Sequence, residues 1–148
     1  MPSMTFEVTT RGEGATGRHR TSSAEFWSVE QRMGGSPEKP NPLELLLGSL
    51  TGCMNVVLQM VAHEKGWAGV SARFRAHGEL DPRGLMGDPA IPPYFHTVTL
   101  DVAVSGVPET ELSDVCQAVG QRCPVHRLFE EAGVHVVENW QTVVEEVH

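Results

Sequence analysis

The sequence predicts an α+β fold, with a single domain spanning residues 1–148. Segments with the alternating pattern of strands come in adjacent pairs, which favours α+β over a doubly wound α/β fold. One long apolar segment carries the start and stop signals of a helix. A length of 148 residues is also sufficient for one core.

The first 40 residues are expected to contribute the N-terminal strands. Residues 5–10 alternate as a strand does, and residues 24–30 are a weaker candidate. Residues 34–40 are rich in Gly and Pro and are expected to form a loop before the first helix. A turn between the two strands is indicated by Gly12, Gly14 and Gly17.

A long central helix is expected over residues 41–66. Asn41 is a suitable N-cap, Pro42 suits the first helical position, and Glu44 completes a capping box. Gly66 is a typical C-terminal stop. Apolar side chains surround this helix except for one narrow stripe, so most of its faces must be buried. The expected cover is the chain's own sheet together with a second copy of the chain.

The rest of the chain is expected to contain two strands, further helices and a last strand. The two strands lie within residues 70–105, separated by a proline-rich loop over residues 81–93. Residues 109–147 are expected to form a helix that breaks at 120–122, a helix that restarts at Cys123, and a strand from residue 134. The predicted order is ββ–α–ββ–α(α)–β.

Composition limits the classes of partner and the compartment. With 11 basic and 19 acidic residues the formal net charge is −8, which disfavours nucleic acid and anionic membranes as partners. No secretory signal is visible, and polar residues interrupt the longest apolar stretch, residues 43–61, so a membrane span is not expected. We expect a soluble, cytoplasmic protein. There, a disulfide between any of the three cysteines would be transient rather than structural.

Two cysteines carry most of the chemical information. Cys53 lies in the apolar central helix, whereas Cys123 precedes a proline at a helix start. Backbone N–H groups at a helix start favour a thiolate, so we expect the Cys123 thiol to be activated there. If the two thiols meet, they support a reversible thiol–disulfide cycle. Cys116 lies on an apolar helix face and is expected to be a core residue.

The segments Asn41-Pro-Leu-Glu-Leu-Leu-Leu, with Cys53 twelve residues after the Asn, and Cys123-Pro-Val resemble the OsmC/Ohr family of thiol-dependent peroxidases. The resemblance implies an intertwined homodimer whose antiparallel sheets wrap around long central helices. It implies that Cys53 attacks an organic hydroperoxide and that Cys123 resolves the product as a Cys53–Cys123 disulfide. It also implies recycling by a small dithiol of the lipoyl type.

A cation is expected near Cys53. This residue stands about three turns into its helix, too far from the N-terminus for the helix dipole to stabilise a thiolate. Members of the resembled family place an activating arginine upstream of this helix. Arg32 is the leading candidate here, and Arg18 and Arg20 are its rivals.

Glu44 departs from the family pattern. Hydroperoxide-resistance members usually carry a catalytic Glu directly after Asn-Pro, where this chain has Leu43. A shift of one residue turns the side chain by about 100° around the helix. Two interpretations stay open: Glu44 is only the capping-box partner, or it orients the activating arginine.

An apolar entrance would favour organic hydroperoxides over hydrogen peroxide. Its expected lining is Leu46, Leu50, Val57, Tyr94 and Phe95. No cofactor is expected. One alternative is a non-catalytic member of the same fold that binds a small molecule. Another is a Cys/His metal module built on Cys123 and His126, but the chain lacks a second ligand pair, so no metal is expected.

Overall fold

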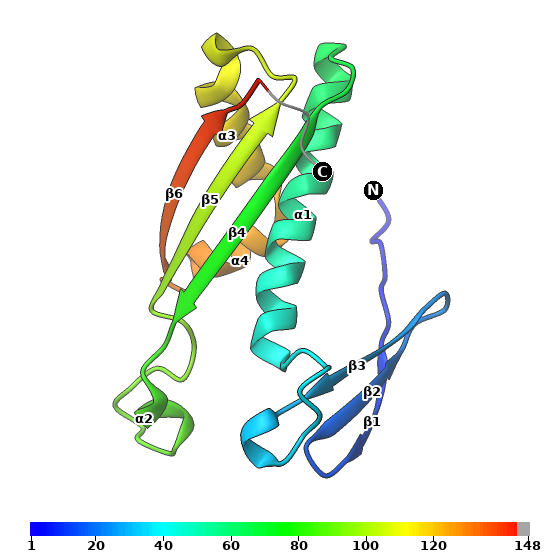
Figure 1. Cartoon of the computed structure of the whole chain (residues 1–148), viewed down its shortest axis with the longest axis vertical. Helices are drawn as coiled ribbons and strands as arrows, with labels where there is room; N and C mark the ends of the chain where they lie inside the picture. The colour runs from blue at the N-terminus through cyan, green and yellow to red at the C-terminus, as the bar shows by residue number, and fades with distance from the viewer. Residues whose placement is uncertain (145–148) are drawn as a thin grey trace. The chain divides into compact units, whose positions relative to one another are not determined.

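The computed structural model describes residues 1–144 and confirms the α+β class (Figure 1). The chain divides into two compact units, an N-terminal unit, Met1–Leu46, and a C-terminal unit that begins at Leu47. The elements in chain order are β1 (Thr9–Glu13), β2 (Thr16–Arg20), β3 (Glu25–Val29), a 3₁₀ turn (Gln31–Met33), α1 (Pro42–Lys65), β4 (Ser71–Glu79), α2 (Pro82–Leu85), β5 (Thr97–Ser105), a 3₁₀ turn (Glu109–Glu111), α3 (Leu112–Arg122), α4 (Pro124–Glu131) and β6 (His135–Thr142).

The N-terminal unit holds a three-stranded antiparallel sheet in the order β1-β2-β3. The strand expected at 24–30 is confirmed by β3, whereas the strand expected at 5–10 begins only at Thr9 and the strand β2 was missed. Gly14 turns the β1–β2 hairpin with φ 56°. Gly17 lies within β2, where it makes room for the His19 ring: a Cβ atom at Gly17 would lie 3.0 Å from both His19 and Ser28. The His19 ring is held by Ser28 Oγ, 2.8 Å from Nε2.

The start and end of α1 agree with the sequence prediction. The Asn41 N–H donates to Glu44 Oε1 at 2.9 Å, and the Glu44 N–H donates to Asn41 Oδ1 at 2.8 Å, which completes the capping box. Gly66 follows the last turn with φ 74°. By length and hydropathy alone α1 would suit a membrane span. However, Leu50 and Leu58 are fully buried in a protein core, which is also how the central helix of a globular domain behaves.

The sheet of the C-terminal unit runs β4-β5-β6, with β4 antiparallel and β6 parallel to β5, so the expectation of antiparallel sheets was wrong for the β5–β6 pair. Helices α1, α3 and α4 cover one of its faces (Figure 1). The alternation expected in 70–105 is confirmed, because one side of β5 forms the centre of the core. The core side chains of β5 are Val98, Leu100, Val102 and Val104.

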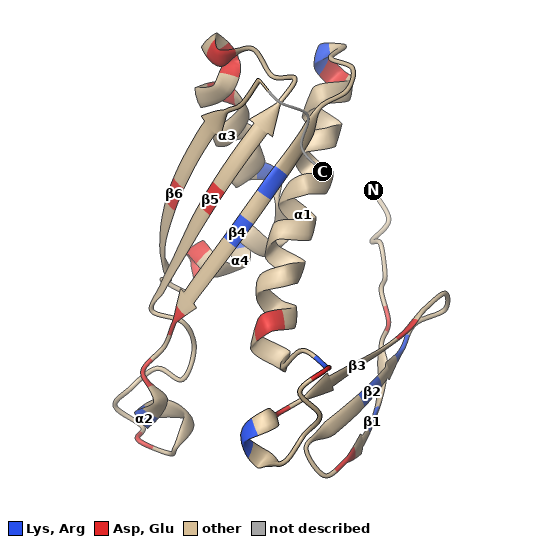
Figure 2. Cartoon of the chain, in the orientation of Figure 1, with Lys and Arg blue, Asp and Glu red and all other residues tan. Residues whose placement is uncertain are grey.

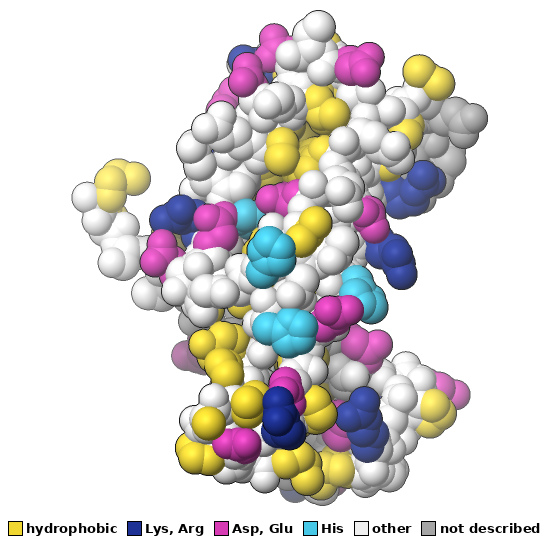
Figure 3. Space-filling model, turned by 90° about the vertical axis from the view of Figure 1, so that its left-hand side faces the viewer, with side chains coloured by type: hydrophobic (Ala, Val, Ile, Leu, Met, Phe, Trp, Pro, Cys, Tyr) yellow, Lys and Arg dark blue, Asp and Glu magenta, His cyan; other side chains and the backbone are white. Residues whose placement is uncertain are grey.

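Two local expectations in the C-terminal unit were wrong. The 81–93 segment contains the short helix α2, capped by Asp81, whose carboxylate accepts the Arg83 N–H at 3.0 Å. Apolar side chains gather on the surface around α2 (Figure 3). The expected break at 120–122 is absent: α3 continues to Arg122, which forms an ion pair with Glu64 at 2.7 Å. The helix ends because Pro124 forces an extended conformation on Cys123, with ψ 115°.

Candidate redox site

The two thiols expected to cooperate are neighbours. Cys53 lies midway along α1, and Cys123 is the residue between α3 and α4. Their side chains interact directly, and both are free thiols. Cys123 has no exposed surface, whereas Cys53 is half-buried against the core. Figure 2 shows that α1 carries no Lys, Arg, Asp or Glu between Glu44 and its last turn, so the helix itself offers no charge to Cys53.

The electrostatic environment of Cys123 contradicts the expected activation at a helix start. Burial raises the pKa of the Cys123 thiol to about 11. The backbone N–H groups of His126 and Val125 act in the expected direction and lower the pKa, while the Cys53 thiol raises it further. The helix start is therefore present, but loss of solvent outweighs it. Cys123 is held as a neutral thiol at neutral pH.

Cys116 is also a poor candidate for a reactive thiol. It is half-buried on α3, and burial together with the negative charge of Glu138 raises its pKa to about 11. Its apolar neighbours Val115 and Val119 belong to the core cluster. Cys116 itself is not part of that cluster, so the expectation that it is a core residue was wrong.

An ionic cluster around the buried His126 lies beside Cys123, and it was not predicted from the sequence. His126 Nε2 lies 3.1 Å from Glu138 Oε2, and His126 Nδ1 lies 2.6 Å from Glu130 Oε1. The second contact is close but poorly aligned for a hydrogen bond. Trp140 Nε1 donates to the other Glu138 oxygen at 3.2 Å. Only the His126–Glu130 spacing of four residues was visible as a signal in the sequence.

This cluster has the composition of a salt bridge rather than of a metal site. Both ring nitrogens of His126 face carboxylates. Within residues 1–144, no group of three or more His, Cys, Asp or Glu residues is arranged to hold a metal ion.

The three candidate arginines lie in the N-terminal unit and differ in their partners. Arg18 Nε lies 2.5 Å from Glu25 Oε1, and Arg20 Nη2 lies 3.4 Å from the same oxygen. Arg32 belongs to the exposed 3₁₀ turn, and its guanidinium has no ion pair or hydrogen bond among the residues that the structure describes. Of the three, Arg32 therefore keeps its charge uncompensated.

The five residues expected to line an entrance fall into two groups. Leu50, Val57 and Phe95 are buried in the core, and the Phe95 ring stacks on Phe129 with 6.4 Å between centroids. Leu46 and Tyr94 present substantial surface, with exposed fractions of 39% and 50%. Contact of any of the five with a substrate stays a prediction.

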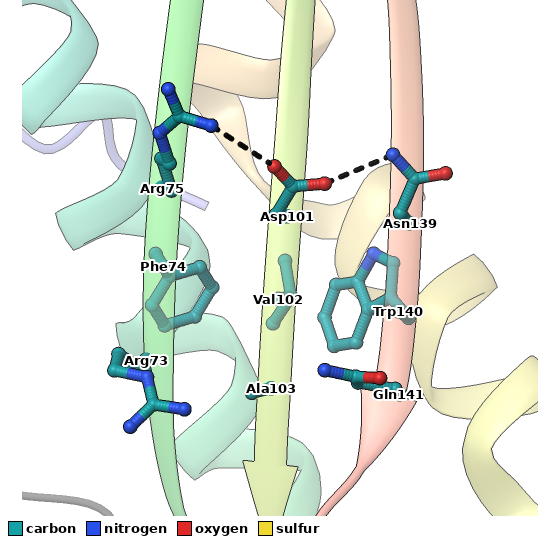
Figure 4. Close-up of a pocket in the computed structure, with 9 residues that line it drawn as sticks. All are labelled: Arg73, Phe74, Arg75, Asp101, Val102, Ala103, Asn139, Trp140 and Gln141. Carbon is teal, nitrogen blue, oxygen red and sulfur yellow. Dashed lines mark hydrogen bonds and ion pairs between the residues drawn. The ribbon is translucent and has the colours of Figure 1, made fainter.

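The C-terminal unit also has a shallow hollow of about 560 Å³ on the outer face of its sheet (Figure 4). Asp101 lies at its centre, where it accepts a hydrogen bond from Asn139 at 3.0 Å and lies 3.9 Å from Arg75. Neither Cys53 nor Cys123 contributes to it. This hollow is thus separate from the thiol chemistry.

The sequence and the fold of this chain are similar to those of known proteins. A family model described as OsmC-like protein matches residues 34–139. An OsmC-like protein from Mycoplasma pneumoniae superposes with a TM-score of 0.81 at 15% identity, covering 96% of this chain and 99% of the other. Organic hydroperoxide resistance proteins from Elizabethkingia anophelis and Bacillus subtilis superpose with TM-scores of 0.68 and 0.66 at 17% and 21% identity. They cover 97% and 93% of this chain, and the matches span 99% and 98% of their own lengths. No curated protein matches the sequence. At these identities the superpositions establish the fold, as the sequence resemblance implied.

Proposed function

Because the chain belongs to the OsmC-like protein family, we propose that it is a cysteine-dependent reductase of organic hydroperoxides. The observation that carries the proposal is the proximity of the two cysteines: Cys53 packs against the core cluster that contains Cys123, and the Cys53 thiol is close enough to raise the pKa of the Cys123 thiol. A peroxide-related role also agrees with the hydroperoxide-resistance proteins among the structural neighbours.

The chemistry divides between the two thiols. The Cys53 thiolate attacks the distal oxygen of the hydroperoxide, the O–O bond breaks, and the leaving alkoxide takes a proton to become an alcohol. Cys53 is now a sulfenic acid. The Cys123 sulfur attacks the Cys53 sulfur, and the displaced hydroxide leaves as water with the thiol proton. A small dithiol of the lipoyl type then reduces the Cys53–Cys123 disulfide and restores both thiols.

The unequal burial of the two thiols suits these unequal roles. Cys53 is the more exposed of the two and is therefore the better placed to meet a substrate. Cys123 is fully buried with a pKa of about 11, so it is a weak nucleophile until an oxidised sulfur stands next to it. A protected resolving thiol is not consumed by peroxide itself.

Arg32 is proposed as the cation that stabilises the Cys53 thiolate and the developing charge on the leaving oxygen. Its lack of a carboxylate partner among the described residues distinguishes it from Arg18 and Arg20. Glu44 is proposed mainly as a helix cap, because both halves of the capping box are formed.

A homodimer is the proposed working form. Val56 and Met60 on α1 are 58% and 48% exposed, although they belong to a long apolar helix. A second copy of the chain would cover such residues, and the same apolar surroundings would favour organic hydroperoxides over hydrogen peroxide. Leu46 and Tyr94 are the proposed entrance residues with surface available. The proposed location is the cytoplasm.

A non-catalytic member of the same fold that binds a small molecule is the second candidate. The position of Glu44, one residue later than in hydroperoxide-resistance members, favours it. The two candidates differ in the reactivity of Cys53 at neutral pH, because only the enzyme needs a thiolate there.

Hydroperoxide consumption in the presence of dihydrolipoamide tests the proposal. The wild-type protein and the Cys116→Ser control should consume cumene hydroperoxide at similar rates, whereas Cys53→Ser should not exceed the uncatalysed rate. Equal consumption by Cys53→Ser and wild type would reject the enzyme and leave the binding protein.

A further inference from the structure

His126 is a buried ionisable residue that takes no part in the thiol chemistry proposed above. It stands three positions after Cys123 in the first turn of α4 and is 3% exposed. Its main partner, Glu138, lies on β6 and is itself largely shielded. An ionic pair inside a protein is costly to bury and is destabilising when one partner is removed, so its presence beside a reactive residue calls for a reason.

The surroundings of His126 favour the charged form of its ring. The hydrogen bond to Glu138 raises the pKa of His126 above its ordinary value, more than burial lowers it. Burial alone would raise the pKa of Glu138, but its hydrogen bonds to His126 and Trp140 hold that pKa below its usual range. The other titratable groups around the pair are Glu130 on α4 and Cys116 on α3.

An acid–base role toward the thiols does not fit this arrangement. Nδ1 faces Glu130 and Nε2 faces Glu138, so neither ring nitrogen is available to accept the Cys123 proton. His126 meets the thiol only through its backbone N–H, which faces the Cys123 sulfur. The remaining possibility is that His126 affects the position of the Cys123 thiol.

The His126–Glu138 pair connects α4 to β6, and this connection can control the position of the Cys123 thiol. α4 has only eight residues, too few for a stable helix without tertiary contacts. The His126–Glu138 contact fastens its first turn to β6, which is paired along its length with β5. The first turn of α4 in turn determines where Cys123 lies, because Cys123 is its N-cap residue.

We propose that His126 and Glu138 are positioning residues for the resolving thiol, holding the start of α4 so that the Cys123 sulfur stays against Cys53 while the disulfide closes. This inference rests on the proposed function and identifies what controls its second chemical step, the closure of the Cys53–Cys123 disulfide. Position matters there because Cys123 is not activated: its pKa of about 11 leaves little thiolate at neutral pH. A high effective concentration of the two sulfurs compensates for weak nucleophilicity.

The closure step can be measured without any peroxide. In a Cys116→Ser background, 5,5′-dithiobis(2-nitrobenzoate) reacts with Cys53 and releases one thionitrobenzoate. Cys123 then attacks the mixed disulfide and releases a second one as the Cys53–Cys123 bond forms. The first phase reports the reactivity of Cys53, and the second reports closure. Mass spectrometry of peptides confirms which sulfurs have joined.

Glu138→Gln and His126→Ala should slow the second phase at least tenfold and leave the first within about twofold of the parent. His126→Gln keeps a donor for Glu138 and should recover part of the loss. The matched control is Glu131→Gln on the solvent side of α4, where Arg127, at 3.0 Å, is the only ionic partner of Glu131 among residues 1–144. It should leave both phases unchanged. Glu138→Gln is nearly isosteric, so it carries the test if His126→Ala fails to fold.

The pH profile separates a charged pair from simple packing. His126 has a raised pKa, so its contribution is complete at low pH and is lost as the pH rises through that value. Glu138 has a lowered pKa, so its contribution is lost as the pH falls through that value. The rate difference between the parent and Glu138→Gln should be largest between these two pKa values and shrink on either side.

Equal second phases in Glu138→Gln, His126→Ala and Glu131→Gln would overturn the positioning role, as would a rate difference that does not vary with pH. A protein whose closure depends on the pair but whose Cys53 is never oxidised by organic hydroperoxides would instead reject the proposed function alone.

Discussion

The thiol of Cys53 lies against the thiol of Cys123, although the first belongs to the middle of a 24-residue helix and the second to a tight junction between two other helices. The contact is part of the core of the C-terminal unit, where α1, α3 and α4 meet. A pair of sulfurs fixed in this way is suited to closing a disulfide without large movement of the backbone.

Replacing the two cysteines should interrupt the cycle at different points. Cys123→Ser removes the resolving thiol, so one equivalent of cumene hydroperoxide should leave Cys53 as a sulfenic acid that dimedone traps, and excess peroxide should oxidise it further. Cys53→Ser should give no dimedone adduct. Intact-mass measurements distinguish these products. A dimedone adduct on Cys123 in the Cys53→Ser protein would contradict the assignment of roles.

The Cys123 thiol should titrate far above an ordinary cysteine. In a Cys53→Ser, Cys116→Ser protein, alkylation of Cys123 by iodoacetamide should rise about tenfold per pH unit between pH 7 and 9, because burial keeps the pKa near 11. Under denaturing conditions the same thiol should titrate near 8.5. A plateau below pH 9 in the folded protein would show that the helix start outweighs burial.

The activating cation should be Arg32. Arg32→Ala is expected to slow oxidation of Cys53 by about 100-fold, at the lower end of the range for loss of one charge-stabilising group. Arg20→Ala should have a smaller effect, since Arg20 is already paired with Glu25. Stopped-flow measurement of Cys53 oxidation gives both values. A large loss in Arg18→Ala together with a normal rate in Arg32→Ala would transfer the role to Arg18.

Glu44→Gln separates the two interpretations of Glu44. Glutamine keeps the capping box but removes the negative charge. If Glu44 is only a cap, this variant should keep wild-type activity and thermal stability, whereas Asn41→Ala should lose about 1 kcal/mol of unfolding free energy. Loss of activity in Glu44→Gln at unchanged stability would assign it a part in catalysis.

Features encoded by local signals were predicted well. The limits of α1 follow from its capping box and from Gly66, and the inner face of β5 follows from a simple alternation. The β1–β2 hairpin was missed because Gly17 was interpreted as part of a turn. In the structure it makes space for a side chain of its own strand. Its role depends on a contact across the sheet, and the local pattern contains no trace of that contact.

The candidate site was likewise predicted only in part. The pairing of Cys53 with Cys123 came from a family pattern; the structure places the two thiols near each other, and their disulfide stays a prediction. The raised pKa of Cys123 could not be predicted, because a helix start has the same sequence pattern whether it is exposed or buried. The His126–Glu138 pair was invisible for a related reason: it requires the register of β6 against β5 and the packing of α4 on that sheet.

The most direct test of the account is the product formed when the reduced wild-type protein meets one equivalent of cumene hydroperoxide. Peptide mass spectrometry without reduction should find a Cys53–Cys123 disulfide in most molecules, with Cys116 still a free thiol and one molecule of alcohol formed per disulfide. Recovery of all three cysteines as free thiols, with the hydroperoxide intact, would contradict the central claim.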